Sequence, residues 1–135
     1  MGTAQVNWLA VVVAALATFL IGGVWYSPIL FARVWMRAAG LTEAELARSF
    51  NPARVFGGAF VLALVMATNL ALFLGPSASL GFGAFAGAAA GLGWVTASLG
   101  IIYLFERRPL LLLLVNGGYQ VVAYTAMGAI LGAWR

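Results

Sequence analysis

The chain has 135 residues, of which 64% are hydrophobic and 7% are charged, whereas soluble domains average about 45–50% apolar and 25% charged residues. Its net charge of +4 comes from arginine and glutamate alone, because cysteine, histidine, aspartate and lysine are absent. This composition excludes an ordinary soluble fold, disulfides, imidazole or thiolate chemistry and most metal sites, so neither a cofactor nor a metal is expected.

Four segments are long and apolar enough to cross a membrane as helices, since one crossing needs roughly 20 apolar residues. They lie at about 6–32, 55–74, 80–105 and 109–133 and take up nearly the whole chain. The expected fold is an all-α membrane protein, a four-transmembrane-helix bundle that forms one domain over residues 1–135. No separate module for binding nucleic acid fits, and the lipid bilayer is the expected surrounding.

The first predicted span ends with Trp25, Tyr26, Ser27 and Pro28. Proline lacks the amide donor and crowds the preceding turn, so Pro28 is expected to kink or end the helix. Trp25 and Tyr26, like Trp94 in the third span, are expected to fill the space that neighbouring glycines leave. Stacking on a ligand is the alternative.

Residues 33–54 form the only substantial piece expected outside the membrane. Gly40 is typical of a helix stop, and Thr42 with Glu45 three residues later makes a capping box, which predicts a short helix over about 43–50. This helix is expected to lie along the membrane surface between the first and second spans.

The third span carries Gly83, Gly87 and Gly91 at four-residue spacing, and the fourth span repeats that spacing with Gly128 and Gly132. Lipid supplies no hydrophobic drive for helix pairing, so a face of small residues is useful because it lets backbones approach closely. The pattern predicts close packing of the third span within the chain, with the fourth span as the plausible partner. An interface with a second protomer is the alternative.

Polar side chains at depth in the spans form a second candidate set, namely Asn69, Asn116, Tyr119 and Gln120. Hydrogen bonding between helices is the simpler interpretation, worth about 0.6 kcal/mol per contact. The alternative is a polar track along a solute path, because polar groups inside a membrane often mark a pathway. No ionisable residue lies within a span, which disfavours a proton relay or a voltage sensor.

The arginines are distributed unevenly between the two sides of the predicted bundle. The first and third connections hold Arg33, Arg37, Arg48, Arg54, Arg107 and Arg108, whereas the opposite side holds only Arg135. By the positive-inside rule, both charged connections are predicted to face the cytoplasm and both termini to lie outside. The predicted location is a bacterial cytoplasmic membrane.

Several short runs along the chain carry a resemblance to a known family. They are Asn7-Trp8-Leu9-Ala10, Gly23, Trp25-Tyr26-Ser27-Pro28, Trp35-Met36, Gly40-Leu41-Thr42-Glu43 and Asn116-Gly117-Gly118-Tyr119. With these runs, over nearly its whole length, the chain resembles the small prokaryotic membrane proteins known as domain of unknown function 1761. The resemblance implies a four-helix membrane domain and brings no activity with it.

Two functions compete on these grounds. The first is a helix-packing, interaction or oligomeric membrane component without catalytic activity, whose partner is a second copy or another membrane protein. The alternative is an oligomeric channel or transporter for a neutral solute or a small anion. An enzyme is not expected, because no nucleophile has a base beside it; lipid chemistry would require Glu43, Glu45 and Glu106 to cluster around a cleft.

Overall fold

The computed structural model describes residues 6–49, 51–75 and 78–134, and the secondary structure of these residues is helical throughout. Four helices are long and apolar enough to cross a membrane. They are α1 (Trp8–Trp25), α4 (Pro52–Leu74), α7 (Leu110–Ala133) and a continuous helix made of α5 (Leu80–Ala90), the π-helical segment η2 (Gly91–Thr96) and α6 (Ala97–Glu106). The predicted four-helix fold is confirmed.

The first helix is shorter than the span over 6–32, because α1 ends at Trp25. In a continued helix the amide of residue 28 would bond to the carbonyl of Val24, and Pro28 has no amide hydrogen to donate. The hydroxyl of Ser27 donates to the Val24 carbonyl instead, at 2.7 Å, and the Ser27 amide does so at 3.2 Å. The chain then turns back on itself at Pro28.

Two short helices, α2 (Ala32–Ala39) and α3 (Glu43–Ser49), follow this turn. Gly40 ends α2 in the left-handed conformation, with a φ of 74°. The predicted capping box begins α3, since the Glu45 amide donates to the Thr42 hydroxyl at 3.2 Å. The sequence pattern predicted α3 but not α2, whose eight residues mix apolar and basic side chains. Residue 50 and Arg135 lie outside the described residues.

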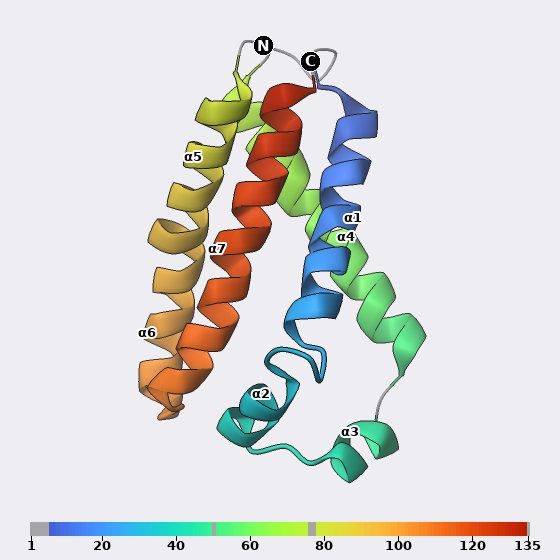
Figure 1. Cartoon of the computed structure of the whole chain (residues 1–135), viewed down its shortest axis with the longest axis vertical. Helices are drawn as coiled ribbons and strands as arrows, with labels where there is room; N and C mark the ends of the chain where they lie inside the picture. The colour runs from blue at the N-terminus through green and yellow to red at the C-terminus, as the bar shows by residue number, and fades with distance from the viewer. Residues whose placement is uncertain (1–5, 50, 76–77, 135) are drawn as a thin grey trace.

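The long helix α7 lies at the centre of the bundle, with α5 and η2 packed on one side and α1 on the other (Figure 1). The fourth long helix, α4, packs mainly on α1 and crosses the bundle at an angle. Asn7 donates to the carbonyl of Trp134 at 3.5 Å, so α1 begins where α7 ends. We call the opposite end, which carries α2, α3 and the α6–α7 turn, the arginine-rich end.

Candidate functional site

The predicted small-residue faces of the third and fourth spans meet each other within the chain. A Cβ built on Gly83 would overlap the backbone carbonyl of Gly128, and one built on Gly87 would overlap that of Tyr124. Each four-residue step along α5 is matched by a four-residue step back along α7, so this contact continues over several turns. We call it the glycine seam, made of Gly83, Gly87, Gly91, Gly128 and Gly132.

The backbones of α5 and α7 lie so close along the glycine seam that they leave no room for a side chain. At its ends, a Cβ on Gly91 would lie 2.9 Å from the carbonyl of Gln120, and one on Gly132 would overlap the carbonyl of Ser79. The glycine face of α5 is thus in contact with α7 of the same chain.

Trp94 does not fill the space beside Gly87 and Gly91, contrary to the expectation from helical spacing. It is 66% exposed, and its ring lies 6.2 Å from that of Phe73 on α4. The cause is the π-helical segment, in which bonds run from residue i to i+5. Thr96 therefore follows Gly91 on the face toward α7, and its hydroxyl contacts the carbonyls of Gly91 at 2.7 Å and Gly117 at 3.3 Å.

The Trp25 side chain joins the end of α1 to the middle of α7. Its indole Nε1 donates to the carbonyl of Val115 at 2.9 Å. Its ring covers Gly118, where a Cβ would lie 2.8 Å from a ring carbon. The Trp25 ring also packs against that of Phe31, just beyond the turn at Pro28, with the ring centroids 4.8 Å apart and the planes tilted by 43°. The turn thus holds the indole against α7 at Gly118, which has no side chain.

A chain of side-chain hydrogen bonds runs from α1 through α7 to α6. The hydroxyl of Tyr26 donates to Asn116 Oδ1 at 2.7 Å, and Asn116 Nδ2 donates to the hydroxyl of Tyr103 at 2.9 Å. Beside it, the Tyr119 hydroxyl donates to the carbonyl of Thr18 at 3.0 Å, with its ring 5.5 Å from that of Tyr26. Both oxygen and nitrogen of the Asn116 amide are therefore engaged.

The four residues of the predicted polar track do not form one set. Asn116 bonds to Tyr26 and Tyr119 bonds to Thr18, as above. Asn69, in contrast, is exposed on α4, and its Nδ2 donates to the carbonyl of Val65 in its own helix at 2.9 Å. The buried Oε1 of Gln120 has no hydrogen-bond partner among the described residues. Asn69 is thus an exposed amide apart from the other three, of which Asn116 and Tyr119 have interhelical hydrogen-bond partners.

Sequence reasoning missed four residues of this site: Tyr103, Thr18, Thr96 and Gly118. The hydrogen-bond partners of Tyr103 and of the two threonines depend on tertiary packing. The pair Gly117-Gly118 next to Asn116 was a usable signal, since adjacent glycines in a membrane helix permit close approach of a neighbour. Thr96 and Trp25 are the neighbours that use them.

Four apolar helices of spanning length define a multi-pass helical membrane protein. The chain belongs to the family described as protein of unknown function (DUF1761), which it matches over residues 9–132. The resemblance noted in the sequence is thereby confirmed. No curated protein and no solved structure matches the chain significantly.

Proposed function

We propose that the protein is a membrane component without catalytic activity that acts by associating with a second copy of itself. The observation that carries this proposal is Asn69, a polar side chain exposed on a helix of membrane-spanning length. An amide facing hydrocarbon is unfavourable, and pairing with another amide across a helix interface relieves that cost.

The surroundings of Asn69 suit a contact between two chains. It lies in a shallow apolar hollow of about 210 Å³ between α4 and η2, beside the exposed rings of Phe73 and Trp94. A second hollow of about 270 Å³ continues it toward Phe82 and Phe85 of α5. These aromatic side chains would be buried by a partner that covers Asn69.

A second copy is the occupant that fits this surface best. A two-fold interface places the same patch of each protomer against itself, so the patch must be self-complementary. Asparagine meets this condition, because its amide offers both a donor and an acceptor. Asn69 of one protomer can therefore pair with Asn69 of the other.

The positions of the carboxylates support the absence of catalysis. Glu43 and Glu45 lie on α3, while Glu106 ends α6 and pairs with Arg108 at 3.2 Å. The two helices lie at opposite sides of the arginine-rich end (Figure 1). The acids therefore do not gather around one cleft, which is the minimum that general acid–base work on a lipid would require.

Replacing Asn69 by Leu is expected to weaken self-association about fivefold or more, because paired amides in a membrane contribute roughly 1 kcal/mol or more. Energy transfer between labelled chains, diluted stepwise in lipid vesicles, measures the change. Ser98→Ala is the matched control, since Ser98 is also exposed and its hydroxyl donates to the Trp94 carbonyl of its own helix at 2.5 Å.

An association constant that is the same for N69L and wild type would overturn the proposal. The alternative of an oligomeric channel or transporter now depends on the Gln120 carbonyl oxygen, which has no described partner. Solute flux in proteoliposomes that is lost in Gln120→Leu would favour that alternative over an association role.

For orientation, we propose that the arginine-rich end faces the cytoplasm, as the positive-inside rule implies. Because the chain has no cysteine, single cysteines report their side cleanly. In intact cells, a membrane-impermeant maleimide is expected to label Trp134→Cys, and to label Glu43→Cys only after lysis. The reverse pattern would contradict this orientation.

A further inference from the structure

The helices α1 and α4 separate toward the arginine-rich end (Figure 1). Near the other end, Ala67 of α4 shares the core with Ala10 and Ala14 of α1, and such small side chains let helices approach closely. Toward the arginine-rich end, the Phe19 ring of α1 lies 5.8 Å from that of Phe60 on α4. The bulky rings hold the two helices apart, and residues 51–59 are exposed.

This separation leaves a groove of about 510 Å³ between α1 and the first half of α4. Its walls include Phe19 and Gly23 of α1 and Val55, Phe56 and Ala59 of α4. A Cβ built on Gly23 would meet nothing within 4 Å, so the space beside this glycine is open. The volume falls within the roughly 300–1,000 Å³ of small-molecule sites, and the walls are mainly apolar.

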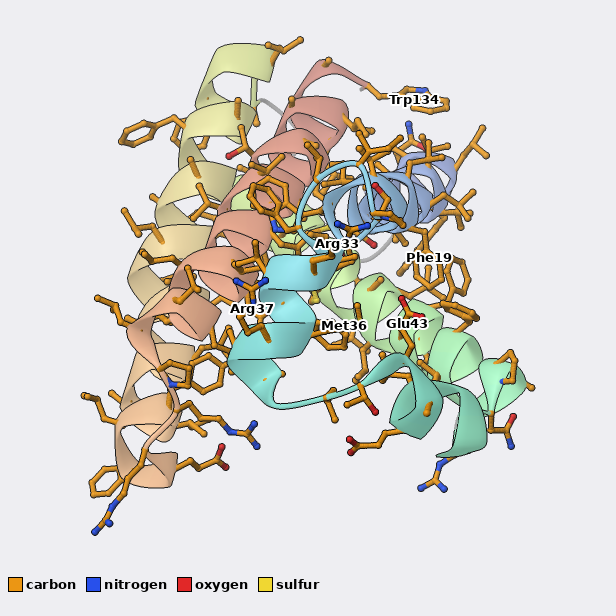
Figure 2. All side chains as sticks on the ribbon, turned by 60° about the horizontal axis from the view of Figure 1, so that its bottom comes forward. Phe19, Arg33, Met36, Arg37, Glu43 and Trp134 are labelled. Carbon is orange, nitrogen blue, oxygen red and sulfur yellow. The ribbon has the colours of Figure 1, made fainter. Side chains whose placement is uncertain are left out.

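Unpaired positive charge lies at the mouth of the groove. Arg54 immediately precedes the wall residue Val55 in the first turn of α4; it is exposed and forms no ion pair with a described acid. Arg33, the second residue of α2, is also exposed and lies at the same end of the bundle. Figure 2, which looks toward this end, shows Arg33 and Arg37 extending from α2, Glu43 from α3, and Phe19 from α1.

We infer that the groove binds one acyl chain of an anionic phospholipid, whose phosphate lies at Arg54. The two halves of the lipid match the two parts of the site. The acyl chain fits the apolar walls within the membrane, and the phosphate fits the arginine at its surface. Guanidinium groups bind phosphate oxygens through two parallel hydrogen bonds, and basic residues at the membrane surface favour anionic lipids. The site is separate from the α4–α5 hollow around Asn69.

The test measures lipid binding to the full-length protein in detergent by native mass spectrometry. Phosphatidylglycerol and phosphatidylcholine with identical acyl chains are the probes, and tighter binding of one phosphatidylglycerol is expected. Gly23→Phe fills the groove and should weaken this binding at least about tenfold, because it replaces the buried methylene groups of the lipid. Gly81→Phe is its control, since Gly81 on α5 is equally open.

A second variant tests the charge without touching the groove walls. Arg54→Gln is expected to weaken phosphatidylglycerol binding about fivefold and to leave phosphatidylcholine binding unchanged. Arg108→Gln, which removes the same charge at the α6–α7 turn, should have no effect. Equal affinity for the two lipids, or equal binding by wild type and the Gly23 variant, would overturn the inference.

The same spectra report how many protein chains associate. If Gly23→Phe changes that number and not the bound lipid, the groove is filled by a second chain and the inference is wrong. A weaker association of Asn69→Leu that leaves lipid binding intact would support the proposed function and this site separately.

Discussion

Replacing Gly87 by Leu is expected to lower the free energy of unfolding by about 3 kcal/mol or more, at the upper end of effects for overfilled packing. A Cβ at this position would overlap the backbone carbonyl of Tyr124, and the backbone of a helix cannot move aside as a side chain can. The two central helices would have to separate. Thermal unfolding in detergent, followed by circular dichroism, measures the loss.

Gly81→Leu on the same helix provides the matched control, because a Cβ there meets nothing within 4 Å. Leucine also favours a helix over glycine by up to about 1 kcal/mol, so this control should be neutral or slightly stabilised. Equal stability of the two variants would show that α5 and α7 are not in the close contact described here. A change in oligomer size without a change in stability would indicate that the glycine face contacts a second chain.

Asn116→Leu is expected to destabilise the single chain by about 2 kcal/mol. The substitution removes both hydrogen bonds of the amide and leaves the hydroxyls of Tyr26 and Tyr103 without these partners. Interhelical bonds in membranes contribute about 0.6 kcal/mol on average and up to about 1.7 kcal/mol, and here two are lost together. Unfolding equilibria of the monomer in detergent provide the measurement.

Two variants separate this effect from a general response to losing a polar group. Tyr103→Phe breaks only one of the two bonds and should cost about half as much. Asn69→Leu removes the same atoms from an exposed position, so it should leave the stability of the monomer unchanged while it weakens association. If Asn116→Leu and Asn69→Leu destabilise the monomer equally, the Tyr26–Asn116–Tyr103 chain contributes nothing specific.

The helices themselves could be predicted because the length of an apolar segment can be counted directly in the sequence. The second, third and fourth predicted spans match α4, the α5–η2–α6 helix and α7 within a few residues at each end. The contact of Gly83 and Gly87 with α7 could also be anticipated, since spacing by four places residues on one helical face. Pro28 marked the end of α1 for a covalent reason, its missing amide hydrogen.

The features that could not be predicted depend on the angles between helices and on local departures from α-helical geometry. A regular α-helix would place Trp94 on the same face as Gly87 and Gly91, but the π-helical turn puts Thr96 there instead. The exposure of Asn69 follows from the inclination of α4, which one helix alone does not determine. The groove has the same origin, because it opens only where Phe19 meets α4 and not where alanines do.

The four-residue repeat of the glycine seam also has a weakness, since it does not by itself define a unique alignment of α5 and α7. A slip by one repeat in one direction, roughly 6 Å along the axis, would bring Gly83 opposite Gly132 and Gly87 opposite Gly128. Thr96 breaks this degeneracy, because it fits over Gly117, whereas the same slip would place it opposite Val121. The π-helical turn, which points Thr96 toward α7, thus fixes how far along each other α5 and α7 align.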